Sequence, residues 1–259
     1  MTRTPTAARY LLDSRYPPPV ECALSFGEMI HRALVLLSDG HPTFTGHMVD
    51  GERTHCQIIP EARPSQAIFS RLLLHAPHGF DGKAQAALHR LERATWGNRP
   101  LRLHLLGMGE PQDFAGPKHC EGRSLAAGRS AAWSSFTPFV PTRYPKTTRA
   151  GAPKLDAQGH QRGGTTHDLL RLLKARGWPT PCDVRELDEG AWAGRCFPWA
   201  GFPSWRTHGQ GQRGGAPTGF RVTFPHEVQG PLVLGYGAHF GLGIFLPCAA
   251  QDHPQEPPP

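Results

Sequence analysis

The sequence predicts an α+β fold made of two tandem units, each built from a small sheet and its covering helices. Three observations lead to this prediction. The first half contains four short strand-like runs and two amphipathic segments in the order β-α-β-β-α-β. The second half repeats a reduced form of that order, and a Gly/Pro-rich stretch lies between the halves. A chain of 259 residues is long enough to bury two small cores.

The first unit begins with a short strand and a long helix. Residues 8–14 (ARYLLDS) have the composition of a strand, which three following prolines stop because proline cannot extend a strand ladder. Over residues 20–38, apolar residues recur at three- and four-residue spacing, and this predicts an amphipathic helix. Ser25 and Glu28 have the spacing of a capping box, and Gly40 is expected to close the helix.

The remaining elements of the first half complete a ferredoxin-like unit. A polar loop at residues 41–53 separates the helix from them. The expected elements are a strand ended by Pro60, a second strand, a helix beginning after Asp81 and an alternating strand, at residues 55–60, 68–75, 82–95 and 101–106. The order β-α-β-β-α-β is that of the ferredoxin-like fold.

The second half predicts a degraded copy of the same unit, in which a loop takes the place of the second helix. The expected elements are a strand, an amphipathic helix and three further strands, at residues 133–140, 167–176, 183–187, 220–224 and 244–246. The predicted organisation is an N-terminal domain, a linker, a C-terminal domain and a disordered tail, at residues 1–112, 113–130, 131–250 and 251–259.

Composition limits the classes of function. The formal net charge of +7 indicates an anionic partner. No apolar run approaches the roughly 18–20 residues of a membrane helix, and the N-terminus lacks the layout of a secretion signal, so a cytoplasmic protein is expected. The six cysteines include no C-x-x-C pair, which favours free thiols over disulfides. Neither a metal nor a small-molecule cofactor is expected.

The stretch 230–247 carries four glycines between an apolar run and the last strand; they are Gly235, Gly237, Gly241 and Gly243. Glycine tolerates positive φ and lets other groups approach closely, so the loop is expected to present bare amides to a ligand. Tyr236, His239 and Phe240 lie between the glycines and could stack on bases or donate to phosphates. An ordinary turn before a buried strand is the plainer interpretation.

The pattern G-x-G-x-x-x-G-x-G-hydrophobic-x-x-P, from Gly235 to Pro247, resembles the C-terminal loop of CRISPR repeat-RNA endoribonucleases. These enzymes belong to the RAMP superfamily, whose members have two ferredoxin-like (RNA-recognition-motif-like) domains. Residues 26–35 (FGEMIHRALV) are similar, with a one-residue insertion, to the first helix of the subtype I-F enzyme, which carries its catalytic histidine. His31 occupies that place here; on pattern alone, a surface histidine on an amphipathic helix is the alternative.

Four further strings look like the nuclease half of the subtype I-G (formerly I-U) fusion protein and its stand-alone type IV relative; they are residues 45–46, 55–60, 74–80 and 137–146. The family usually carries His-Ala-x-x-Leu-Pro where residues 55–60 stand, and this chain has Cys56 and Ile59 in two of those places. A chain that ends soon after the glycine loop fits the stand-alone relative better.

The resemblance implies metal-independent cleavage of CRISPR precursor RNA at the repeat hairpin, giving 2′,3′-cyclic phosphate and 5′-hydroxyl ends. It also implies that the protein stays on the 3′ hairpin as an effector-complex subunit, with the crRNA hairpin and other subunits as partners and no membrane. Histidine suits the proton transfers, and cationic side chains suit the charge on phosphorus. The catalytic candidates are His31, His55, Arg32 and Tyr236. His75, His78 and His239 stay open, whereas His104, in an alternating strand, is expected to be structural.

Basic segments of the second half predict the RNA contacts. Residues 143–176 contain eight Lys/Arg and two Asp/Glu, and residues 195–221 contain no acidic side chain. A solvated charged face would give the same pattern, but arginines in Gly-rich loops beside an aromatic residue suit an RNA backbone. The RNA-binding candidates are Arg143, Tyr144, Lys146, Arg149, Lys154, Arg162, Trp205, Arg206, Arg213, Gly235, Gly237, His239, Gly241 and Gly243.

Two other functions remain open from the sequence. A cleavage-deficient subunit that only binds the RNA hairpin would carry the same superfamily motifs. An unrelated basic protein that binds DNA or zinc is the third hypothesis, and neither helix-turn-helix nor zinc-finger spacing supports it.

Overall fold

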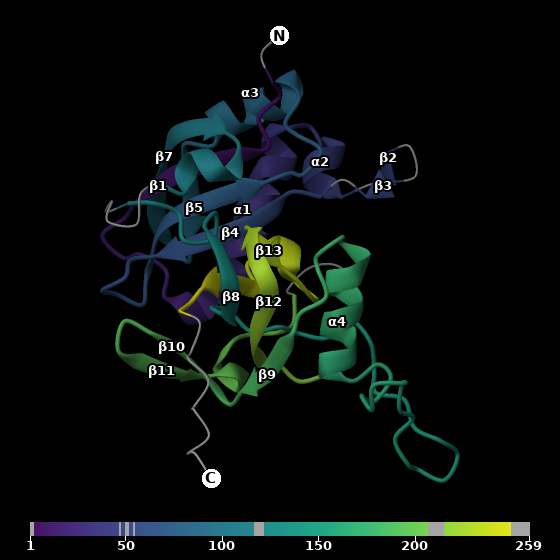
Figure 1. Cartoon of the computed structure of the whole chain (residues 1–259). Coiled ribbons are helices and arrows are strands. Elements are labelled where there is room, and N and C mark those ends of the chain that lie inside the picture. The colour runs from purple at the N-terminus through teal and green to yellow at the C-terminus, as the bar shows by residue number, and fades with distance from the viewer. Residues whose placement is uncertain are drawn as a thin grey trace.

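The computed structural model describes residues 3–46, 48–49, 52–53, 55–116, 122–206 and 215–249, and contains two five-stranded antiparallel sheets (Figure 1). Two short hairpins accompany them, one formed by β2 (Met48–Val49) with β3 (Glu52–Arg53), the other by β10 (Glu189–Trp192) with β11 (Arg195–Pro198). The predicted contacts of Arg213 and the predicted tail at residues 251–259 lie outside the described residues.

The first sheet has the strand order β4-β5-β1-β7-β6. Its strands are β1 (Ala7–Asp13), β4 (Gln57–Ala62), β5 (Phe69–His75), β6 (Arg93–Trp96) and β7 (Arg99–Gly109). The helices α1 (Ala23–Leu37) and α3 (Gly82–Arg90) contribute their buried apolar side chains to the same core as β1 and β5. The hydroxyl of Tyr10 on β1 donates to the carbonyl of Leu88 on α3 at 2.8 Å, which ties sheet to helix.

The second sheet has the order β13-β14-β8-β12-β9. Its elements are β8 (Arg129–Ser135), α4 (Thr165–Ala175), β9 (Asp183–Leu187), β12 (Gly219–Gln229), β13 (Leu232–Val233) and β14 (Ile244–Pro247). Leu169 and Leu173 of α4 are buried against the strands. Here β9, β12, β8 and β14 take the relative positions of β4, β5, β1 and β7 in the first sheet.

The two sheets therefore confirm the predicted α+β fold of tandem ferredoxin-like domains. In the second domain, the connection between β12 and β14 holds no α-helix. Residues 230–243 fill that place with the short strand β13, a glycine loop and the 3₁₀ turn η4 (Ala238–Phe240). The predicted loop in place of the second helix is thus confirmed, and it lies beside the first domain.

Two predictions about the start of the first domain are wrong. The N-cap of α1 is Cys22, with the 3₁₀ turn η1 (Val20–Cys22) before it, and no capping box forms. The hydroxyl of Ser25 donates to the carbonyl of Cys22, and Glu28 is held by an arginine distant in sequence. The predicted polar loop at residues 41–53 contains the short helix α2 (Pro42–Thr45) and the β2–β3 hairpin.

Three further boundaries differ from the predictions. Pro60 lies inside β4 and pairs with Leu72, which proline tolerates because β4 is an edge strand. Helix α3 ends at Arg90, because the following residues turn at Gly97 (φ 59°) and form the β6–β7 hairpin. The first strand of the second domain begins earlier than predicted, at Arg129, and ends at Ser135.

Asp81 caps α3 as predicted, with its carboxylate accepting from the amide of Ala84 at 2.8 Å. Gly40, with φ 76°, donates to the carbonyl of Val35 and closes α1 as predicted. The cysteines that the structure describes form no disulfide. None of the described helices has both the length and the apolar character needed to cross a membrane.

Candidate active site

Three histidines from separate segments meet where the two domains touch. His31 lies on α1, His55 lies just before β4, and His239 lies in η4 of the second domain. The rings of His55 and His239 are stacked with centroids 3.9 Å apart and planes 20° apart. The ring of His31 is 5.8 Å from that of His55, at 66°. The two histidines predicted as catalytic are therefore neighbours, and the third candidate is the glycine-loop histidine.

Phe240 forms the wall that the histidines share. Its ring meets those of His31 and His55 edge-on, at centroid distances of 4.9 and 5.6 Å. The phenyl ring is buried, and the guanidinium of Arg206 lies 4.0 Å from its centroid on a cation–π contact. The predicted RNA-binding residues His239 and Arg206 therefore lie at the histidine cluster.

The glycine loop reaches α1 because Gly27 has no side chain. A Cβ atom at Gly27 would lie 2.3 Å from the carbonyl oxygen of Phe240 and 2.4 Å from its carbonyl carbon. On the loop side, a Cβ at Gly241 would lie 2.8 Å from the carbonyl oxygen of Ala23. The backbones of helix and loop thus touch without intervening side chains, and this contact sets the distance between His31 and His239.

The four loop glycines all have positive φ, at 97°, 72°, 90° and 62° for Gly235, Gly237, Gly241 and Gly243. The expectation that the loop presents bare amides is wrong for four of its residues. The amides of Tyr236, Phe240, Leu242 and Gly243 donate to carbonyls of the chain itself, at 2.7, 2.8, 3.2 and 2.9 Å. In the structure, the glycines serve the backbone turns and the close packing on α1.

Charge at the site is set by a buried ion pair. Nε of Arg206 lies 3.1 Å from Oε1 of Glu28, whose side chain is 6% exposed. Burial lowers the pKa of His31 below its ordinary value, and the positive charges of Arg206 and Arg32 lower it further. A hydrogen bond with the backbone of Phe44 and the charge of Glu28 oppose this shift. His31 is therefore neutral at pH 7, and its buried Nε2 has no hydrogen-bond partner in the described structure.

The other catalytic candidates occupy different places. Arg32 is exposed on the outer side of α1. Tyr236 is partly buried and packs on the small cluster that joins the glycine loop to α1, made of Leu24, Val140, Phe240 and Leu242. Neither side chain is in ring contact with the three histidines.

The remaining histidines differ from the cluster in environment. Nδ1 of His75 is 3.0 Å from Oε1 of Gln57, and burial lowers the pKa of His75 to about 4. His104 is half exposed and lies 3.8 Å from Asp13, which fits the expectation of a role outside the site. His78 is exposed after β5.

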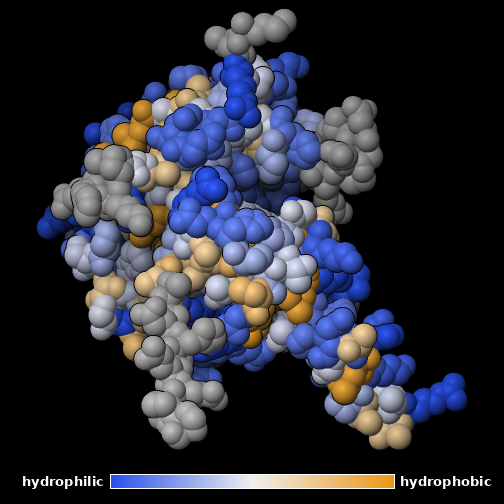
Figure 2. Space-filling model, viewed as in Figure 1, coloured by the Kyte–Doolittle hydropathy of each residue, from blue (hydrophilic) through white to orange (hydrophobic). Residues whose placement is uncertain are grey.

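Six of the predicted RNA-binding residues lie on an arm that projects from the second domain (Figure 1). The arm, residues 143–162, folds back on itself through backbone hydrogen bonds, including Lys154 to Lys146 and Arg162 to Lys154. Hydrophilic side chains project from its end (Figure 2). The exposed members are Arg143, Tyr144, Lys146, Arg149, Lys154 and Arg162.

A buried carboxylate anchors the base of this arm. Asp168 on α4 is fully buried and accepts from the amide and hydroxyl of Thr142, at 2.6 and 2.9 Å. Arg171 donates to the other oxygen of Asp168 and pairs with it at 2.7 Å. The arm is thus a built feature of the second domain and not an unattached loop. Trp205, next to Arg206, is 60% exposed.

Sequence reasoning missed Gly27 and gave Glu28 a different role. Both lie in the interior of α1, where a glycine is unfavourable for the helix and an acid is usually exposed. The glycine in a helical pattern was the available signal of a close approach. No group of three His, Cys, Asp or Glu side chains in the described ranges could hold a metal ion.

Comparison with known proteins gives structural neighbours at low identity. No protein-family model and no curated protein matches the chain. The neighbours include a CRISPR-associated protein Cas6, with a TM-score of 0.44 and 10% identity over 95% of this chain and 99% of the other. A Cas6 product complex matches with a TM-score of 0.40 and 14% identity, covering 95% of this chain and 100% of that one. A Cas6-related protein from Pyrococcus furiosus matches with a TM-score of 0.38 and 11% identity over 93% and 97%. The structural neighbours are thus Cas6 and RAMP proteins.

Proposed function

We propose that this chain is a metal-independent endoribonuclease that cleaves the repeat hairpin of CRISPR precursor RNA and retains the 3′ hairpin. The observation that carries the proposal is the meeting of His31, His55 and His239 beside Arg206 at the domain junction. The RAMP-like glycine loop supplies the substrate class. The proposal includes a cytoplasmic effector-complex subunit related to the subtype I-G and type IV proteins.

The proposed reaction is a transesterification within the RNA. The 2′-oxygen attacks the adjacent phosphorus, its bond to phosphorus forms, and the bond from phosphorus to the 5′-oxygen breaks. A base takes the 2′-proton and an acid supplies a proton to the leaving 5′-oxygen, which balances the reaction and gives a cyclic phosphate and a 5′-hydroxyl.

The cluster offers both proton roles. A neutral imidazole is the form needed for a base, and the lowered pKa of His31 keeps it neutral at pH 7. The stacked pair of His55 and His239 lies on the side of His31 where an acid is needed, and either ring can carry the proton. The guanidinium of Arg206 lies on the same aromatic wall and can stabilise the charge that develops on phosphorus.

The exposed arm extends the interface away from the cluster. Its cations suit the phosphates of a hairpin stem, because a duplex presents closely spaced negative charges along its axis. Tyr144, more than half exposed on the same arm, offers a ring on which an unpaired base can stack.

The testing experiment incubates the protein with labelled repeat hairpin RNA in EDTA. We expect His31→Ala to lower the single-turnover cleavage rate by roughly 10²–10⁴-fold while leaving hairpin affinity within a factor of two or so. His104→Ala is the matched control, since His104 is half exposed and apart from the cluster, and it should cleave at the normal rate. Normal cleavage by His31→Ala would refute the role of His31 as the base.

A binding-only subunit is the second candidate, favoured by one specific observation. Nε2 of His31 is buried in the free protein, behind the rings of Phe240 and His55. Tight hairpin binding by the wild type, with no cleavage over many hours in EDTA or with added divalent metal, would establish this second function in place of the first.

A further inference from the structure

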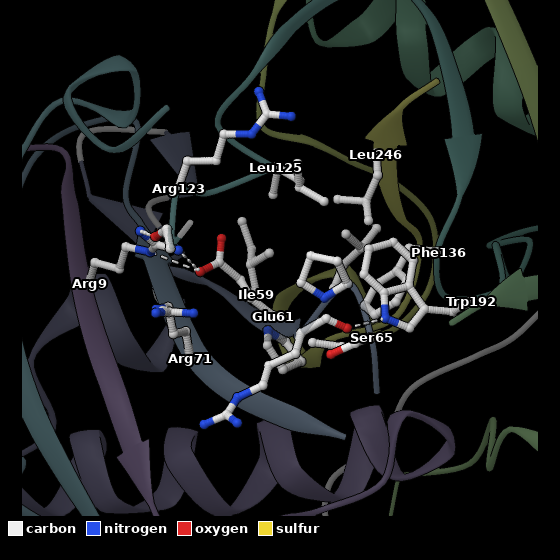
Figure 3. A pocket seen from close by; sticks show the side chains of 17 residues that line it. Arg9, Ile59, Glu61, Ser65, Arg71, Arg123, Leu125, Phe136, Trp192 and Leu246 are labelled. Atoms are coloured by element: carbon white, nitrogen blue, oxygen red, sulfur yellow. Dashed lines mark hydrogen bonds and ion pairs between the residues drawn. The ribbon is translucent and has the colours of Figure 1, made fainter. Parts of the chain in front are cut away.

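A second feature lies between the two domains, away from the histidines. It is a cavity of about 580 Å³ formed by β1, β4 and β5 of the first domain and by residues 122–126, β10 and β14 of the second (Figure 3). None of the three clustered histidines lines it. Its volume falls in the range of about 300–1,000 Å³ that is usual for small-molecule sites.

One side of the cavity is strongly cationic. Arg9 pairs with Glu61, with Nε and a terminal nitrogen 2.9 and 2.8 Å from the same carboxylate oxygen. The hydroxyl of Ser124 donates to the other oxygen of Glu61, so this carboxylate is fully used. Arg63, Arg71 and Arg123 also line the cavity, and none of them forms an ion pair with a described carboxylate. Four arginines therefore face one acid.

Arg71 has the environment of an anion-binding group. It lies on β5 and is partly buried in the wall of the cavity. Burial lowers the pKa of Arg71, and the neighbouring positive charges of Arg9 and Arg63 act in the same direction. A bound anion would offset both the repulsion and the lost hydration, because a partly buried guanidinium interacts more strongly with a charge than an exposed one.

The opposite side of the cavity is aromatic and apolar, as Figure 3 shows for Phe136, Trp192 and Leu246. The rings of Phe136 and Trp192 meet edge-on with centroids 4.9 Å apart. The indole N–H of Trp192 donates to the carbonyls of Arg63 and Gln66, at 2.8 and 3.2 Å, which fixes the ring against the arginine-bearing loop. Such a wall accepts a flat ring by stacking.

We propose that this interdomain cavity binds one nucleotide unit, with its phosphate on Arg71 and Arg123 and its base against Trp192 and Phe136. The unit is a nucleoside monophosphate or a single unpaired nucleotide of a bound RNA strand, since both present the same ring and phosphate. The second source rests on the proposed function, whereas the first does not.

The test measures binding of AMP and UMP to the full chain by isothermal titration calorimetry. We expect Arg71→Ala, Arg123→Ala and Trp192→Leu each to weaken binding about tenfold or more, because a charge-assisted hydrogen bond or a stacked base is worth about 1–3 kcal/mol. Arg129→Ala is the matched control, an exposed arginine paired with Glu227, and should bind as the wild type does. Circular dichroism and thermal melting confirm that each variant is folded.

A second arm identifies the source of the nucleotide. Hairpin RNA with and without a single-stranded 5′ extension is titrated into the same proteins by fluorescence anisotropy. Loss of the extension's contribution in Arg123→Ala, with no effect of free nucleotide, assigns the site to the RNA strand. Binding of AMP or UMP that depends on these residues assigns it to the free nucleotide. If neither ligand binds, or if binding is unchanged in all three variants, the proposal is overturned.

The two proposals fail separately. Hairpin cleavage in EDTA reports only on the histidine cluster, and Arg123→Ala is expected to keep the wild-type cleavage rate on a hairpin that lacks the extension. Absence of cleavage with nucleotide binding intact would refute the nuclease proposal alone.

Discussion

Replacing Gly27 by alanine changes the distance between the two halves of the histidine cluster without touching a histidine. The added Cβ would lie 2.3 Å from the carbonyl oxygen of Phe240, and the neighbour is backbone, which cannot swing aside. Restoring an ordinary contact of about 3.4 Å requires the loop to retreat by about 1 Å. His239 and Phe240 move with it, away from His31 and His55.

A displacement of this size should reduce chemistry far more than binding. A misplacement of about 1 Å in a catalytic constellation can cost roughly 10²-fold in rate. Alanine favours the helix by up to about 1 kcal/mol, but overpacking costs about 1–3 kcal/mol, so the free energy of unfolding should fall by about 1 kcal/mol. We therefore expect Gly27→Ala to remain folded and to bind the hairpin, with a single-turnover rate about 10²-fold below the wild type.

The control for this variant is Gly82→Ala. Gly82 is the first residue of α3, and a Cβ there would meet no atom within 4 Å. Single-turnover cleavage and filter binding are measured on both variants with the same hairpin RNA. A wild-type cleavage rate in folded Gly27→Ala would refute the reasoning that the helix–loop contact positions the cluster.

Three further predictions concern the rest of the molecule. The pKa of His75 is about 4, below its ordinary 6.5, so the unfolded chain takes up this proton first; stability is full above about pH 6.5, and about 3 kcal/mol is lost as pH falls to 4, measured by urea unfolding. His75→Gln should flatten that loss. Asp168→Ala leaves Arg171 and the base of the arm unpaired and should cost about 3 kcal/mol in the same assay; a loss under about 1 kcal/mol would contradict the anchoring role. Replacing Arg149 and Lys154 by glutamine should reduce the slope of log affinity for hairpin RNA against log salt by about 2, whereas Arg93→Gln should leave it unchanged.

Much of the fold follows from local patterns in the sequence. The three- and four-residue spacing of residues 20–38 and the alternation at residues 183–187 predict elements that the structure contains, α1 and β9. The errors occur where long-range pairing decides the outcome. Pro60 sits in a strand because β4 is at an edge, and the predicted helix stops early because residues 93–96 pair with β7. Neither edge position nor pairing partner is written in the local sequence.

The candidate site could be predicted in part. His31 and His55 came from motif similarity, and the structure places their rings 5.8 Å apart. The contact between Gly27 and Phe240 joins residues more than two hundred positions apart, so spacing cannot reveal it. The pairing of Glu28 with Arg206 has the same origin: the local pattern made Glu28 a helix cap, while the folded chain uses it to hold a cation at the site.

The identity of the RNA ends left by the wild-type protein tests the central claim most directly. A repeat hairpin of defined length is incubated with the protein in EDTA, and the upstream product is weighed by mass spectrometry, with a 2′-deoxy substitution at the scissile nucleotide as the matched substrate. The account predicts a 2′,3′-cyclic phosphate from the all-RNA hairpin and no cleavage of the deoxy hairpin. A 3′-hydroxyl product, or cutting of the deoxy hairpin at the normal rate, would contradict it.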